Sequence, residues 1–231
     1  MKTDDKKPLN VGIIISPNVA LMDLFGAHAV FGMAGNVSIH ILWKDKTLLH
    51  GAPSFPIAAT TTFDDCPELD VLITGAVPPD IIEDKEIIQF IRRQAKNDPY
   101  LIGICGGVLL YGAAGLLQDR KATTNFHLLH ILPDLGAIPV EGGHVVRDEK
   151  LFTAGPATGG FEAALLVLKE LRGEAAAKLL ELTIEYHPNP PFGVGTPELA
   201  GAEMTSQAKE IYSSLFAACG KSAIGALKNY G

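Results

Sequence analysis

The sequence predicts an α/β protein in which a mostly parallel β-sheet is sandwiched between helices. Short apolar runs rich in Val and Ile alternate with segments of helical spacing along most of the chain, which is the order of strand–helix–strand units. The runs are continuously apolar, which is typical of strands covered by helices on both faces. A length of 231 residues is enough for one such domain with a substantial core.

Four strands and two helices are predicted in the first half of the chain. Pro17 ends the first strand, and Pro99 separates the second helix from the strand that follows it. This second helix carries its apolar residues on one side, as a helix packed on a sheet does. The predicted strands are 11–16, 38–43, 70–74 and 100–104, the predicted helices are 23–33 and 80–97, and hairpin-like excursions fall within 48–63.

The second half contains shorter predicted strands, at 121–124, 138–140, 144–147 and 151–153, and helices at 161–171 and 174–186. A proline-rich arm then leads to a last helix with an apolar stripe that needs a covering surface, formed by Met204, Ala208, Ile211 and Leu215. We therefore divide the chain into an α/β domain, 9–197, and a C-terminal helical extension, 198–231. The extension would pack on the domain or on a second copy, and we expect a homodimer.

The composition excludes several classes of partner and cofactor. A net charge of −7 argues against nucleic acid or an anionic membrane, because either would require a basic patch. The first ten residues contain no apolar stretch, so we expect no secretory signal and a cytoplasmic protein. Three cysteines without C-x-x-C spacing argue against disulfides and structural zinc. The sequence contains neither a dinucleotide-binding fingerprint nor a phosphate-binding loop, so we expect no metal and no cofactor.

The most informative segment is Gly103-Ile104-Cys105-Gly106-Gly107, between a predicted strand and a small-residue helical stretch. It is the thiol version of a nucleophile elbow, in which small neighbours permit the strained backbone of a tight turn. Because a helix start stabilises a thiolate, we expect Cys105 to be the most acidic of the three thiols. Two alternatives stay open: a buried junction whose cysteine merely packs, and a membrane span. The apolar run is shorter than the roughly 20 residues of a span and contains five glycines.

Asp23 is the carboxylate that most resembles a partner for this cysteine. It follows the first predicted strand, where it could simply be the N-cap of a helix. However, the carboxyl ends of parallel strands meet at one edge of a sheet, so we expect Asp23 and Cys105 to face each other there. A carboxyl group in that place can exchange protons with the thiol. The histidines offer no single clear partner, and the candidates are His28, His127, His130 and His144.

Several segments together resemble the ThiJ/PfpI superfamily, and within it the isonitrile hydratases. The likeness runs from about residue 9 to residue 197 and is carried by 22–26, 104–107, 112–118, 122–124, 136–140, 145–148 and 185–192. It implies a flavodoxin-like fold, similar to that of the class I glutamine amidotransferases. It also implies a small-molecule substrate, no cofactor and a homodimer.

The resemblance further implies a reaction. Cys105 would be the nucleophile and Asp23 the acid/base carboxylate. The thiolate would attack the terminal carbon of an R–N≡C group, and the resulting thioimidate would take up water and leave as an N-substituted formamide. The residues that would contact the substrate or an oxyanion are Gly75, Ala76 and Gly106. The protease branch has a histidine directly after the cysteine, where Gly106 stands here, so we expect no peptidase activity.

Four places depart from the hydratase pattern. Gly106 stands where those enzymes have a threonine, and 74–76 replaces a Pro-Gly-Gly turn with Thr-Gly-Ala. In addition, 125–126 replaces a His-Trp pair with Asn-Phe, and 154–158 replaces a Gly-Gly-Gly-Ile-Thr-type loop with Ala-Gly-Pro-Ala-Thr. These places surround the expected pocket. Two other functions therefore stay open: a thiol-dependent hydrolase of a different substrate, and a non-catalytic redox or stress sensor whose Cys105 is oxidised.

Overall fold

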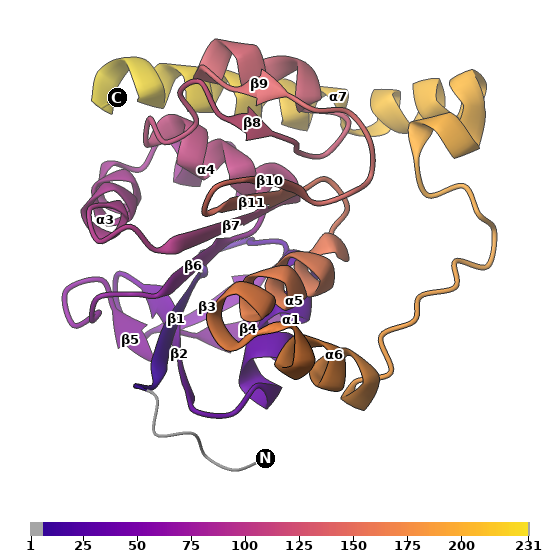
Figure 1. Cartoon of the computed structure of the whole chain (residues 1–231). Helices are drawn as coiled ribbons and strands as arrows, with labels where there is room; N and C mark the ends of the chain where they lie inside the picture. The colour runs from indigo at the N-terminus through magenta and orange to yellow at the C-terminus, as the bar shows by residue number, and fades with distance from the viewer. Residues whose placement is uncertain (1–6, 231) are drawn as a thin grey trace.

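The computed structural model describes residues 7–230 and is built around one seven-stranded sheet (Figure 1). Outside the described residues lie residue 231 and residues 1–6. The expectation of no secretory signal concerns the first ten residues, so most of that stretch is among them. The strand order is β10–β11–β7–β6–β1–β2–β5, and all neighbours are parallel except β10 and β11. This confirms the predicted class. The strands are β1 (Leu9–Ile14), β2 (Val37–Trp43), β5 (Thr61–Thr62), β6 (Val71–Thr74), β7 (Tyr100–Ile104), β10 (Val146–Asp148) and β11 (Leu151–Ala154).

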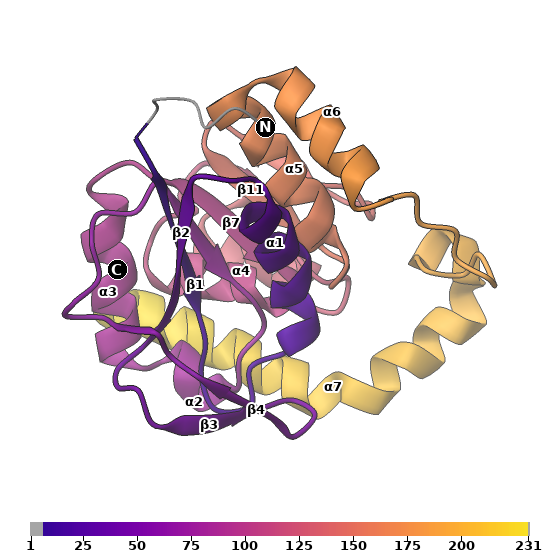
Figure 2. The same cartoon turned by 90° about the horizontal axis from the view of Figure 1, so that it is seen from below.

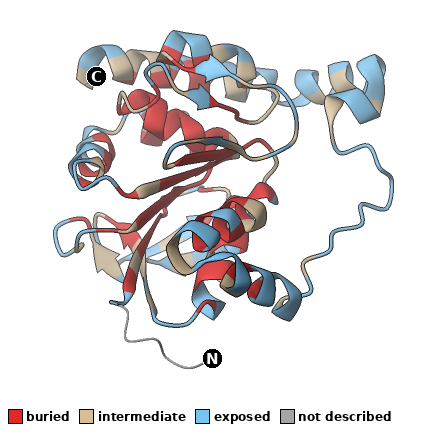
Figure 3. Ribbon diagram, in the orientation of Figure 1, coloured by how far each residue is buried: buried red, intermediate tan, exposed pale blue. Residues whose placement is uncertain are grey.

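Helices cover both faces of the sheet (Figures 1 and 2). One face carries α1 (Leu21–Met33), α5 (Gly159–Arg172) and α6 (Glu174–Thr183), with α5 packed between the other two. The opposite face carries α2 (Pro79–Ile82), α3 (Lys85–Ala95), α4 (Val108–Ala113) and α7 (Pro197–Tyr230). Between these layers β6 is fully buried and β7 is buried except for Tyr100 at its start (Figure 3), which is why their sequences are largely apolar.

Two elements differ from the prediction. The expected helix 80–97 is split into α2 and α3, because the Asp84 side chain accepts hydrogen bonds from the amides of Glu86 and Ile87 and so caps a new helix. The 3-10 segment η2 (Leu129–Leu135) lies where no element was expected. The predicted excursion is present as a hairpin of β3 (Leu48–Gly51) and β4 (Phe55–Ala58), while β8 (Lys121–Ala122) and β9 (Ile138–Pro139) form a small separate pair.

The apolar run that raised the alternative of a membrane span forms three short elements instead. Strand β7 is followed by the turn η1 (Cys105–Gly107) and then by α4. That alternative is therefore wrong for this segment. Within residues 7–230, none of the helices combines the length and the apolar character that crossing a membrane requires.

The C-terminal extension has two parts with different surroundings. The last part of α7 packs on α2 and α4, where Cys219, Ala223 and Ala226 are buried and Ser222 donates a hydrogen bond to Glu83 at 2.8 Å. The first part of α7 and the arm 187–195 are exposed and extend beyond the sheet (Figures 2 and 3). The extension therefore completes the core with one half and leaves the other half uncovered.

Dimerisation stays a prediction, and the exposed part of α7 is where we expect it. Ile211 is 71% exposed and Leu215 is 46% exposed, although both are large and apolar. Replacing both by glutamate is expected to convert a dimer into a monomer at micromolar concentration, as measured by light scattering. Leu182→Glu, at an equally exposed position on the other side of the sheet, is the control and should stay dimeric. A wild-type monomer would contradict the prediction.

Candidate active site

Cys105 lies on a strained turn directly after β7. Its φ is 54°, a left-handed conformation that a residue other than glycine adopts at a cost of about 1–3 kcal/mol. Gly107 makes the turn possible, because a Cβ there would lie 2.4 Å from the carbonyl oxygen of Thr74. The turn is fastened by two hydroxyl groups: Thr74 donates to the carbonyl of Gly107 at 3.0 Å, and Thr124 to that of Cys105 at 2.6 Å. The strained backbone that the sequence predicts is therefore present.

Asp23 lies in the first turn of α1 and is almost completely buried, at 1% exposure. It is not the N-cap, which is Ala20. Its carboxyl accepts a hydrogen bond from the amide of Ala76 at 2.8 Å and shares another with the Cys105 thiol. A Cβ on Gly75 would lie 2.9 Å from the Cβ of Asp23, so glycine is needed for this close approach. The prediction that Asp23 lies within hydrogen-bond reach of Cys105 is confirmed.

Asn125 is the second side chain that contacts the Cys105 sulfur, and it was not among the residues predicted for the site. Its side chain forms a hydrogen bond with the Cys105 thiol that favours the thiolate. Its Oδ1 accepts a hydrogen bond from the amide of His127 at 3.1 Å, which orients the side chain. The sequence offered two signals: its place directly after the predicted strand 121–124, and the replacement of a His-Trp pair by Asn-Phe at 125–126, near the expected pocket. These signals become meaningful only when the partners are known.

Burial is the largest influence on both titratable groups of the site. It raises the pKa of Asp23 from 3.8 to about 6, against the hydrogen bonds from Ala76 and Cys105. Burial, together with the charge of Asp23, raises the pKa of Cys105 from 9.0 to about 12. The pKa values of Cys66 and Cys219 rise only to about 11. The expectation that Cys105 is the most acidic thiol is therefore wrong, because burial beside a carboxylate outweighs the amides of the elbow.

Asp23 and Cys105 together hold one proton between pH values of about 6 and about 12. The negative charge of Asp23 is one cause of the raised pKa of Cys105. When Asp23 is protonated this charge is absent, and the thiol loses its proton more easily. The proton can therefore pass along the hydrogen bond and leave a thiolate beside a neutral carboxyl group. This pair is suited to nucleophilic chemistry in which the sulfur is activated only when its proton is transferred.

The raised pKa of Asp23 predicts a stabilising substitution. The folded state binds this proton more tightly than the unfolded state, so the contribution of Asp23 to stability falls as pH rises from 3.8 to about 6 and is constant above that. At about 1.4 kcal/mol per pH unit, ionised Asp23 costs the folded state up to about 3 kcal/mol. We expect Asp23→Asn to raise the free energy of unfolding at pH 7.5 and to leave it nearly unchanged at pH 3.5. Denaturant unfolding at both pH values measures this, and an equal effect at both would contradict it.

Comparison with known proteins places this chain in a family. Residues 10–170 match the family model described as the DJ-1/PfpI family. The chain belongs to this family. It is also 40% identical, over 204 residues, to an isonitrile hydratase of Pseudomonas putida, a match that covers 87% of this chain and 89% of the relative. The resemblance stated from the sequence is confirmed.

Solved structures support the same family. A ThiJ/PfpI family protein from Pseudomonas syringae has a TM-score of 0.88 and 30% identity, with 95% of this chain and 93% of that chain covered. DJ-1beta of Drosophila melanogaster has a TM-score of 0.68 and 16% identity, with coverages of 78% and 99%. At this low identity, the second similarity shows only that the two proteins share the flavodoxin-like fold.

The three backbone positions expected to contact a substrate have different surroundings in this DJ-1/PfpI protein. The amide of Ala76 binds the Asp23 carboxyl, so it positions the carboxyl group. The amide of Gly106 forms a hydrogen bond with the Cys105 sulfur. Gly75 supplies space for Asp23. In this structure the amides of Ala76 and Gly106 therefore bind the two members of the Cys105–Asp23 pair.

The candidate histidines do not contribute to the pair. Among the described residues, the polar partners of the sulfur are Asp23, Asn125 and the Gly106 amide. His127, the nearest in sequence to Asn125, stacks its ring on Phe216 of α7 at a centroid distance of 4.4 Å, and the ring of Phe126 is tilted against it at 4.0 Å. Across residues 7–230, no three His, Cys, Asp or Glu side chains gather in a way that could hold a metal ion.

Asn125 is expected to control the reactivity of the thiol in this DJ-1/PfpI protein. Asn125→Ala removes a hydrogen bond to a charged group, worth about 1.5–3 kcal/mol, so alkylation of Cys105 by iodoacetamide at pH 8 should slow roughly tenfold to a hundredfold. The pKa of Cys105 should rise further. Peptide mass spectrometry measures the rate, and Cys66 in the same chain is the internal control. An unchanged ratio of the two alkylation rates would contradict the assignment.

Proposed function

We propose that this protein is an isonitrile hydratase-like enzyme that adds water to a small isonitrile and releases an N-substituted formamide. The observation that carries the proposal is the buried hydrogen-bonded pair of Cys105 and Asp23 on a strained turn. The 40% identity to an isonitrile hydratase supports the choice of reaction. We assign Cys105 as the nucleophile and Asp23 as the acid/base group.

The first half of the reaction forms a covalent intermediate. Asp23 accepts the thiol proton while the sulfur of Cys105 attacks the terminal carbon of R–N≡C. A new S–C bond forms, the carbon takes the proton from Asp23, and the triple bond becomes the double bond of a thioimidate, R–N=CH–S–Cys. The Asn125 side chain and the Gly106 amide stabilise the charge on the sulfur until the bond has formed.

Water completes the reaction in the second half. Asp23, again ionised, accepts a proton from a water molecule as its oxygen bonds to the thioimidate carbon. The nitrogen takes this proton from Asp23, which becomes ionised again, the C–S bond breaks, and R–NH–CHO leaves. The sulfur regains its proton from the new O–H group as the carbonyl forms. One water is consumed, no electrons are transferred, and no cofactor is required.

The same pair argues against the sensor alternative. Oxidation of a cysteine follows the fraction of thiolate and its exposure. Burial raises the pKa of Cys105 to about 12, above those of the other two thiols, so peroxide should not oxidise it selectively. A thiol-dependent hydrolase would use the same two residues on a different carbon, and it differs from the proposal only in its substrate.

A panel of isonitriles tests the proposal. Purified protein is incubated with butyl, cyclohexyl and benzyl isonitrile, and the formamides are quantified by NMR. We expect formamide from at least one of them, with catalytic turnover. Hydrolysis of activated esters without formamide formation would favour the hydrolase, and rapid sulfinate formation at Cys105 without any turnover would favour the sensor.

A further inference from the structure

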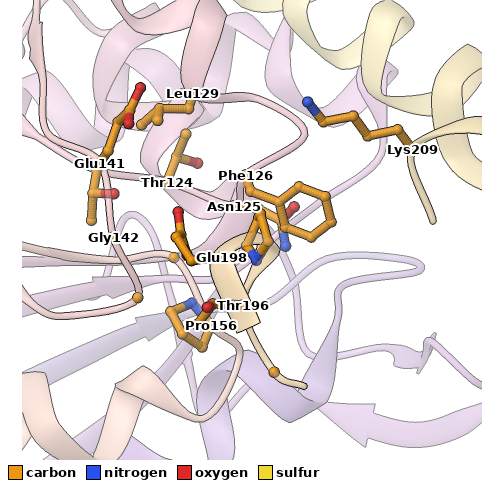
Figure 4. A pocket seen from close by; sticks show the side chains of 15 residues that line it. Thr124, Asn125, Phe126, Leu129, Glu141, Gly142, Pro156, Thr196, Glu198 and Lys209 are labelled. Carbon is orange, nitrogen blue, oxygen red and sulfur yellow. The ribbon is translucent and has the colours of Figure 1, made fainter. Parts of the chain in front are cut away.

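A cavity of about 300 Å³ lies next to the Cys105 site, and the mechanism above does not use it (Figure 4). Its wall includes Thr124 and Asn125, which hydrogen bond to the carbonyl and to the sulfur of Cys105. The volume is at the lower end of the range for small-molecule sites, about 300–1,000 Å³. The cavity therefore begins one side chain away from the sulfur and has room for one substituent of a small substrate.

The C-terminal extension closes this cavity. One part of the wall comes from the segment 123–129 and from turns at 141–143 and 155–156. The other part comes from the end of the arm and from α7, namely residues 195–198 and Lys209. The stack of His127 on Phe216 fixes α7 to the loop that carries Asn125. The shape of the cavity therefore depends on the position of α7.

The cavity wall carries more acidic than basic side chains. Two carboxylates, Glu141 and Glu198, and one ammonium group, Lys209, line it. The amide of Glu198 itself and the Thr196 hydroxyl lower the pKa of Glu198, so it stays ionised near neutral pH. Lys209 lies apart from both carboxylates in Figure 4, and it forms no ion pair with any carboxylate of the described chain. The carboxylates of the cavity therefore outnumber its one ammonium group, and that group is not paired with either of them.

We propose that this cavity binds the substituent on the isonitrile nitrogen and favours substituents that carry an ammonium group. The assignment to an isonitrile rests on the proposed function. Glu141 and Glu198 attract the ammonium group, and the ring of Phe126 offers it a cation–π surface. The positive charge of Lys209 repels the ammonium group and so limits the preference, and replacing Lys209 should therefore strengthen it. The reaction leaves this substituent intact, and the formamide product therefore occupies the same cavity.

Two matched products test the preference without turnover. N-(3-aminopropyl)formamide and N-butylformamide have the same chain length and differ in one ammonium group. We expect calorimetry at pH 7.5 to show that the first binds at least about threefold more tightly. Glu141→Gln should reduce this ratio and Lys209→Met should increase it. Glu203→Gln, an exposed change on the same helix as Lys209 but outside the cavity wall, should leave it unchanged. Equal affinities, or a ratio that neither variant moves, would overturn the proposal.

Turnover of the matching isonitriles separates this proposal from the function on which it rests. Hydration of butyl isonitrile, together with equal affinities for the two formamides, would overturn the cavity assignment and leave the proposed function in place. A Glu141-dependent preference for the ammonium ligand without hydration of either isonitrile would overturn the isonitrile chemistry, while the cavity would keep its ligand class. Hydration of both, with kcat/KM higher for 3-aminopropyl isonitrile, supports both proposals.

Discussion

Replacing Cys105 by alanine is expected to lower kcat/KM for isonitrile hydration by at least about a thousandfold. The sulfur forms the covalent bond of the proposed mechanism, and its loss leaves only positioning of the substrate by the surrounding groups. Formamide production measured by NMR gives the rate. Rapid quenching of the wild type, followed by mass spectrometry, should also detect the isonitrile mass added to the peptide that contains Cys105.

Cys66→Ser is the matched control, because this thiol is also partly buried but lies away from the pair, against Gln94 and Pro67. It should hydrate isonitriles at close to the wild-type rate. If Cys105→Ala kept more than about a tenth of the activity, the sulfur would not be the nucleophile. An adduct found on Cys66 or Cys219 would lead to the same conclusion.

Asp23→Asn is expected to lower kcat/KM by at least about a hundredfold, the usual contribution of a general acid or base. Asparagine keeps the shape of the side chain and can still accept the amide of Ala76, but it cannot exchange a proton with Cys105. The wild-type kcat/KM should fall as pH decreases through about 6, because protonated Asp23 no longer accepts the thiol proton. This decrease should be absent from the residual activity of the variant.

Asp80→Asn is the control for this substitution, since Asp80 is also an aspartate in the first turn of a helix but is exposed. It should change neither kcat/KM nor its pH dependence. Together with the expected gain in stability, loss of activity in Asp23→Asn would identify a residue kept for chemistry at a cost in stability. Retained activity with an unchanged pH profile would remove Asp23 from the mechanism.

The sequence predicted the sheet and the cysteine elbow because each leaves a local pattern. Continuous apolar runs predict buried parallel strands, and the glycines around Cys105 predict a strained turn. Asp23 was predicted from topology, because strand ends meet at one edge of a parallel sheet, and from the family resemblance. The structure confirms that it shares a hydrogen bond with Cys105.

Other properties of the site depend on contacts between distant segments. Asn125 reaches the sulfur only because the loop after β8 lies against the end of β7, and no local pattern marks an asparagine for that role. The acidity of Cys105 was predicted wrongly, since burial depends on every element packed around the sulfur. The wall of the cavity likewise combines loops of the domain with residues of α7, which contacts the domain through the stack of His127 and Phe216. The sequence thus determined which groups are available and where strands end, because those signals are local, while the tertiary structure decided their pKa values and the shape of the pocket, because burial is a property of the whole fold.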